Sequence, residues 1–123
     1  MLFITTGITT HRGLAAAALL AEEKIDAGVL HLHTIKPLDE QGILDAVCKA
    51  KVVISVEEHR IAGGLGSAVA ELLAESGELS GRRFARIGLP DHFNHELGSQ
   101  DLILEKYGIT SKNIVAKTKG LLD

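Results

Sequence analysis

Glu57, Glu58 and His59 stand together directly after an apolar, β-branched run, and two carboxylates with an imidazole are groups that general acid–base catalysis uses. Neighbouring residues on an extended segment point to opposite faces, so these three side chains do not all reach one substrate atom. We therefore favour a structural role, in which they tie down the following loop by hydrogen bonds and face a neighbouring domain. Acid–base catalysis within this chain is the weaker alternative.

A glycine-rich turn over residues 63–67, with the sequence GGLGS, opens a helical pattern, where backbone amides can hold a phosphate. The turn departs from the nucleotide-binding motifs. The dinucleotide fingerprint requires a third glycine where this chain has Val69, and no Gly-Lys-Ser/Thr triplet occurs. Tight packing of the backbone against another element is the favoured interpretation, and anion binding is the alternative.

Two groups of side chains resemble metal ligands. His31 and His33 share one face of an extended segment, and a later loop carries Asp91, His92, His95 and Glu96. A closed metal site needs four placed ligands and a supporting second layer of hydrogen bonds, which neither group provides by itself. Solvated or hydrogen-bonded histidines are the favoured interpretation.

Alternating strands and helices must position these groups. Four apolar, β-branched runs predict strands at Leu2–Thr6, Val29–Ile35, Val52–Val56 and Phe84–Ile87, so that Glu57 begins the polar end of the third. Helical spacing of apolar residues follows each run, and the expected N-caps are Thr9 or Thr10, Asp39, and Thr110 or Ser111. The apolar face of the first helix is expected to consist of Leu14, Ala17, Ala18, Ala21 and Ile25. This order predicts an α/β fold with three α/β/α layers and a mostly parallel sheet of about four to five strands.

Length and composition agree with one folded domain over residues 1–123. The chain has 46% hydrophobic residues and few aromatic ones, so its core must be aliphatic. Its net charge of -3 gives no broad positive potential that would attract nucleic acid or anionic membranes. No targeting segment is recognisable in the sequence. Cys48 lies among apolar residues and is expected to be a buried, inert thiol, which suits a reducing cytoplasm.

Five motifs in register resemble the C-terminal domain of transketolases. They are IKPLD at residues 35–39, VEEH at 56–59, GGLGSAV at 63–69, GLPD at 88–91 and LEKYGIT at 104–110. Thr6 and Gly7 after the first strand also match, so the resemblance covers essentially the whole chain. On these motifs the chain is identified as a member of the transketolase C-terminal domain family, and the C-terminal section of a split transketolase is one form it could take.

The resemblance implies a parent enzyme that uses thiamine diphosphate and a divalent metal such as Mg²⁺ to move a two-carbon ketol unit between sugar phosphates, as in pentose phosphate metabolism. In that family the cofactor lies between a pyrophosphate-binding and a pyrimidine-binding domain at a dimer interface. The residues that hold it have no counterpart in this sequence. We therefore expect the isolated chain to bind no cofactor and to be inactive. Deoxyxylulose-phosphate synthases and the β subunits of 2-oxoacid dehydrogenases end in the same domain, but the Tyr107-Gly108-Ile109 ending favours transketolase.

The expected role is organisational, within a homo-oligomer and beside the cofactor-binding domains or subunit. The family domain usually begins with a further antiparallel edge strand that this sequence lacks, so we expect a partner or a second copy to cover that edge in a split subunit or excised piece. A free-standing regulatory domain that binds a phosphorylated small molecule at the glycine turn is the alternative. The residues expected to form the interface or fix the loop are Lys36, Asp39, Glu57, Glu58, His59, Gly63, Gly64 and Gly66.

Overall fold

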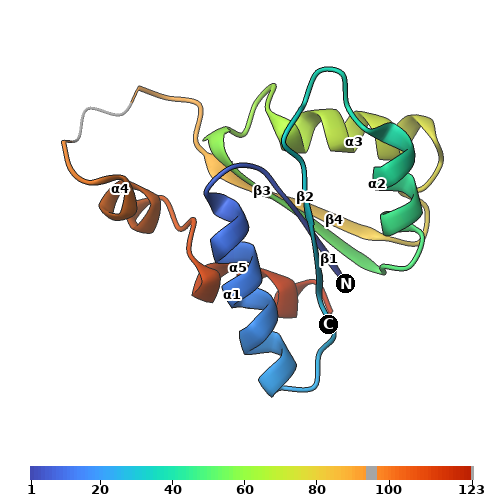
Figure 1. The fold of residues 1–123 in the computed structure, drawn as a ribbon, viewed down its shortest axis with the longest axis horizontal. Coiled ribbons are helices and arrows are strands. Elements are labelled where there is room, and N and C mark those ends of the chain that lie inside the picture. The colour runs from blue at the N-terminus through green and yellow to red at the C-terminus, as the bar shows by residue number, and fades with distance from the viewer. Residues whose placement is uncertain (94–96, 123) are drawn as a thin grey trace.

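The computed structural model describes residues 1–93 and 97–122, in which strands and helices alternate along most of the chain (Figure 1). The strands are β1 (Leu2–Thr5), β2 (Gly28–His31), β3 (Val52–Arg60) and β4 (Arg83–Leu89). The helices are α1 (Thr9–Glu22), α2 (Glu40–Val47), α3 (Leu65–Glu75), α4 (Gln100–Lys106) and α5 (Ser111–Gly120). No helix in the described part of the chain has the length and apolar character needed to cross a bilayer.

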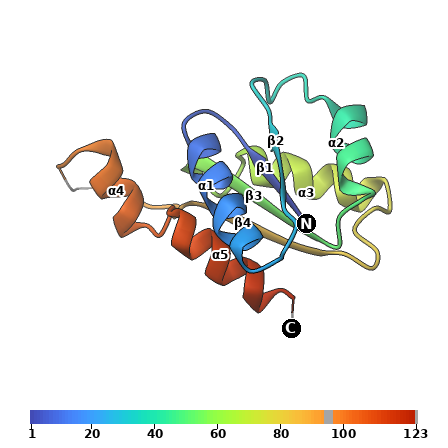
Figure 2. The same cartoon turned by 60° about the horizontal axis from the view of Figure 1, so that its bottom comes forward.

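One sheet organises the fold. Its strands have the order β2-β1-β3-β4, and all three pairings are parallel. Helices α2 and α3 cover one face of the sheet, whereas α1 and α5 cover the other, and α4 lies beyond the ends of the strands (Figures 1 and 2). The predicted three-layer α/β fold with a parallel sheet is thus confirmed.

The two central strands, β1 and β3, are buried on both faces. Successive side chains point to opposite faces, so Ile4 and Val53 contact the layer of α2 and α3, whereas Phe3 and Ile54 contact the layer of α1 and α5. This double burial is the reason that both strands read as continuous apolar runs. The same alternation turns the side chain at position 57 of β3 toward α3.

Two of the three predicted helix N-caps are present in the structure. The Asp39 carboxylate accepts a hydrogen bond from the Gly42 N–H at 3.0 Å, and the Thr110 hydroxyl accepts one from the Asn113 N–H at 3.1 Å, as predicted. The predicted cap of α1 is wrong, because this helix begins after Ile8 without a side-chain cap. The Thr9 hydroxyl instead donates toward the Thr6 and Val56 carbonyl oxygens, at 2.7 and 2.8 Å, and ties α1 to β3.

Four other expectations need correction. Helix α1 was expected to bury the face with Leu14, Ala18 and Ala21, but these three are exposed, and the opposite face with Gly13, Ala16 and Leu20 packs on the sheet. Strand β3 does not end at Val56 but continues to Arg60, which pairs with Leu89 after an irregularity in the register. Strand β2 covers Gly28–His31 only, shorter than the predicted 29–35. Cys48 is exposed rather than buried, because it follows the last turn of α2 at the surface, where its thiol donates to the Asp45 carbonyl oxygen.

Candidate functional site

The loops after the four strands gather at one edge of the sheet, because all four strands run in the same direction. The structure divides the eight predicted site residues among three places at this edge. Glu57, Gly63, Gly64 and Gly66 meet at the start of α3. Glu58 and His59 occupy the end of β3, and Lys36 and Asp39 belong to the connection between β2 and α2.

Glu57 is the centre of the first group and is fully buried, with 0% of its surface exposed. Its Oε2 accepts a hydrogen bond from the Leu65 N–H at 2.7 Å, and its Oε1 accepts one from the Gly66 N–H at 2.9 Å. These are the first amides of α3; they have no partner within the helix and carry the positive end of its dipole. The carboxylate therefore occupies the place where a bound phosphate would lie.

The glycines of the turn leave room for this arrangement. A methyl group at Gly64 would overlap Glu57 Oε2, and one at Gly66 would lie 2.5 Å from the Ser55 hydroxyl oxygen. Gly63 has a φ of 75°, a left-handed conformation that other residues rarely adopt. Close packing thus accounts for the glycine-rich sequence without a ligand.

Arg86 and Ser67 complete the support of the β3–α3 turn (residues 61–64). From β4, Arg86 Nη1 donates to the Ile61 carbonyl oxygen and to the Ser67 hydroxyl, both at 2.9 Å. The Ser67 hydroxyl also accepts a hydrogen bond from the Gly63 N–H at 3.0 Å. Neither residue was among the predicted site residues, although the charge of Arg86 within the predicted strand Phe84–Ile87 was a usable signal.

Glu58 and His59 take no part in this arrangement. The half-buried Glu58 lies on the opposite face of β3 and accepts a hydrogen bond from the Gln100 side chain at 2.5 Å. His59 is exposed, and its Nδ1 lies 3.0 Å from the Arg60 carbonyl oxygen. The alternation along the strand turns Glu58 away from Glu57, and His59 is exposed whereas Glu57 is buried, so the three polar residues do not converge as an acid–base site.

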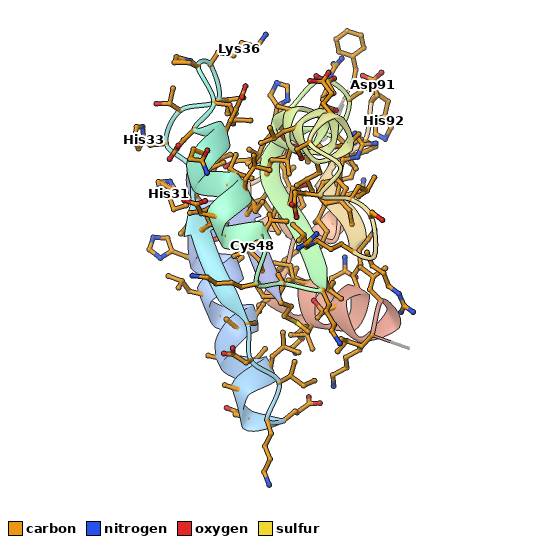
Figure 3. The ribbon with its side chains drawn as sticks, turned by 90° about the vertical axis from the view of Figure 1, so that its right-hand side faces the viewer. His31, His33, Lys36, Cys48, Asp91 and His92 are labelled. Atoms are coloured by element: carbon orange, nitrogen blue, oxygen red, sulfur yellow. The ribbon has the colours of Figure 1, made fainter. Side chains whose placement is uncertain are left out.

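The connection between β2 and α2 borders an open groove of about 360 Å³. Asp39 lines this groove and caps α2, whereas the exposed Lys36 points away from the body of the protein in Figure 3. His31 and His33 also line the groove, and His33 Nδ1 lies 2.6 Å from the Thr34 hydroxyl oxygen. Most of the remaining lining is aliphatic, so the groove is an open apolar surface with a polar rim.

The candidate metal ligands come from opposite sides of the molecule. Figure 3 shows His31, at the end of β2, and His33, just after it, on one side and Asp91 with His92 on the other. His95 and Glu96 lie outside the described residues. Among the described residues, no group of three or more histidine, cysteine, aspartate or glutamate side chains is placed to hold a metal ion.

The fold and this edge of the sheet define a class of protein. It is a parallel α/β domain in which a carboxylate of the chain itself, that of Glu57, occupies the position for an anion at the start of α3. The sequence matches the family described as "Transketolase, C-terminal domain" over residues 1–114. The chain belongs to the transketolase C-terminal domain family.

Individual relatives agree with this assignment. A transketolase family protein of Sinorhizobium fredii is 45% identical over 123 residues, covering 99% of this chain and 35% of the relative. A 1-deoxy-D-xylulose-5-phosphate synthase of Geobacter sulfurreducens is 42% identical over 119 residues, covering 97% of this chain and 18% of the relative. A solved structure described as a split gene transketolase, inactive beta4 tetramer, has a TM-score of 0.84 and 34% identity, and the match covers 98% of this chain and 38% of that one. The chain therefore spans between 18% and 38% of the length of these proteins.

Proposed function

We propose that this chain is the C-terminal, non-cofactor-binding part of a transketolase-type enzyme and that it acts in assembly, while ketol transfer belongs to the complete enzyme. One observation carries the proposal: the Glu57 carboxylate occupies the first two amides of α3. In an α/β sheet these amides are the usual place for a phosphorylated ligand. A turn that satisfies them internally is suited to contact with another protein surface.

The β3–α3 turn is the first contact that we propose. Ala62 and Gly63 are exposed at its tip and carry no charge, and Ile61 beside them is half-buried. The hydrogen bonds of Arg86 and Ser67 fix the conformation of the turn. A surface that is already ordered loses little conformational entropy on binding, which favours its use as a docking point.

The outer edge of β2 is the second proposed contact. The Gly28 and Leu32 N–H groups donate to the Met1 and Thr5 carbonyl oxygens of β1, at 2.9 and 2.8 Å. The backbone groups of the residues between them alternate, so the Val29 and His31 N–H groups face the side of β2 where no strand of the described chain lies. An extended segment of a partner chain would satisfy these groups by adding a strand.

We propose that thiamine diphosphate and its divalent metal are held by the partner domains. The start of α3 does not fit a diphosphate, because the Leu65 and Gly66 amides already bind a buried carboxylate whose charge would repel it. No catalytic role is assigned to a residue of this chain. The alternative of a regulatory domain for a phosphorylated ligand at the same turn loses support for the same reason.

Calorimetric titration of the purified chain with thiamine diphosphate and Mg²⁺ tests the cofactor part of the proposal. We expect no binding heat above dilution. Tight, magnesium-dependent binding to this chain alone would overturn it.

Co-expression with a chain that carries the pyrophosphate- and pyrimidine-binding domains of a transketolase tests the assembly part. We expect the two chains to copurify and the pair to transfer a ketol unit between sugar phosphates, which neither chain does alone. The variant Ala62→Glu should weaken copurification at least about tenfold, since it places a charge in the contact. Ala74→Glu, the same change at the exposed far end of α3, is the control and should copurify normally. Equal recovery of both variants would contradict the proposed contact.

A second parent activity also has support, because relatives named 1-deoxy-D-xylulose-5-phosphate synthase are 42% identical. Product analysis of the reconstituted pair distinguishes the two activities. Formation of 1-deoxy-D-xylulose 5-phosphate in place of ketol transfer would assign the synthase reaction.

A further inference from the structure

The outer side of α1 has no charged residue over residues 13–21, although much of it is exposed to solvent. Leu14 is 53% exposed and Leu19 is 37% exposed, and the exposed alanines Ala15 and Ala18 lie between them. An amphipathic surface helix normally places polar residues on this side. The other described helices do so, with exposed pairs such as Glu40 and Asp45 on α2, Glu71 and Glu75 on α3, Asp101 and Glu105 on α4, and Lys112 and Lys117 on α5.

These side chains form one continuous stripe. At about 100° per residue, positions 11, 14, 15, 18, 19 and 22 fall on the same side of the helix. The stripe lies opposite the buried side, where Gly13, Ala16 and Leu20 face the sheet and α5. Figure 1 shows α1 in front of α5 and the sheet, and Figure 2 shows α5 beside α1.

The stripe is also self-complementary. In an antiparallel pair of α1 helices related by a twofold axis, Leu14 faces Leu19 of the second copy, and Ala15 faces Ala18. The small alanines at the centre allow the helix axes to come as close as about 8 Å. The same register places His11, at one end of the stripe, beside Glu22 of the second copy, so an imidazole meets a carboxylate twice across the axis.

We propose that this chain forms a twofold dimer through the stripe of α1 formed by His11, Leu14, Ala15, Ala18, Leu19 and Glu22. One patch that matches itself under a twofold rotation is the signature of an isologous interface between identical chains. A different partner would need no such symmetry of size and charge. This inference goes beyond the proposed function, since it concerns neither the β3–α3 turn nor the edge of β2.

A contact of three helical turns is small for a stable interface, so the dimer is weak, with a dissociation constant in the micromolar range. Analytical ultracentrifugation of the full chain from about 5 to 300 μM should show the mass rising from the monomer value of 13.1 kDa toward twice that value. A chain that stays monomeric over this range overturns the proposal. That result would leave copurification with a cofactor-binding chain untouched, so the two proposals fail separately.

Three variants test the surface and the register. Ala15→Glu, at the centre of the stripe, should raise the dissociation constant at least about tenfold, whereas the control Ala116→Glu, on the exposed side of α5, should leave it unchanged. His11→Glu should weaken the dimer by setting two glutamates together, and adding Glu22→Lys should restore it. Circular dichroism melts show whether each variant is folded. Association that survives Ala15→Glu, or a double variant that stays as weak as His11→Glu, contradicts the proposed antiparallel pair.

Discussion

Replacing Glu57 with glutamine tests the central feature of the site, the buried carboxylate at the start of α3. Glutamine keeps the shape, but its NH₂ group must face one of the two amides that the carboxylate oxygens now accept from. The lost charge-assisted hydrogen bond contributes about 1.5–3 kcal/mol, and the orphaned buried amide costs about 1–3 kcal/mol. Removing a charge from the interior offsets part of this loss. We expect a net destabilisation of about 3 kcal/mol.

Urea denaturation followed by far-UV circular dichroism gives the change in the free energy of unfolding. With an unfolding entropy of about 2.1 cal/mol/K per residue, a loss of 3 kcal/mol in a chain of 123 residues lowers the melting temperature by about 12 °C. Hydrogen exchange adds a local measurement. The Leu65 and Gly66 amides should exchange faster in the variant, because they lose the carboxylate acceptor.

Glu58→Gln is the matched control, because it makes the same change in charge one residue along β3. Glu58 is half-buried, and its one described side-chain hydrogen bond joins the exposed Gln100. We expect a loss below about 1 kcal/mol. If Glu57→Gln were no more destabilising than Glu58→Gln, the carboxylate would not hold the turn, and it would not keep a ligand from the start of α3.

Three further changes probe contacts described above. Gly66→Ala should destabilise by about 2 kcal/mol in urea denaturation because its methyl group overlaps neighbouring side chains, whereas Gly120→Ala, with open space around it, should cost less than about 0.5 kcal/mol. Arg82→Ala should lower the melting temperature by about 8 °C, since its guanidinium donates to three carbonyl oxygens, of the last residue of α2 and of two residues that follow it; the exposed Lys49→Ala should leave it within about 2 °C. Thr9→Val should cost about 1–2 kcal/mol, and a neutral result would show that its buried hydroxyl does not stabilise the join between α1 and β3.

Much of the fold follows from local patterns in the sequence. The runs at β1 and β3 predicted buried parallel strands because side chains on both of their faces must be apolar. Asp39 and Thr110 predicted helix starts because their side-chain oxygens bind amides only three residues away. Each of these signals acts within a few residues, so the order of amino acids contains it completely.

The candidate site was predicted in part, and the missing part depends on contacts between distant residues. The motif marked Glu57 and the glycines, but the sequence did not show that the carboxylate is buried against α3, or that Arg86 reaches across from β4 to Ile61. Cys48 was misjudged because apolar neighbours in sequence do not establish burial at a helix end.

The sequence by itself determined the fold class, the family and the residues that mark the turn, because periodicity, caps and motifs are local properties. Only the tertiary structure decided that the positive end of α3 is filled by Glu57 and that the apolar side of α1 faces outward. The physical reason is that burial and electrostatic pairing depend on which elements pack together. Because α1 has apolar residues on both sides, the spacing of Leu14, Ala18 and Ala21 predicted the wrong face, and Gly13, Ala16 and Leu20 face the sheet instead.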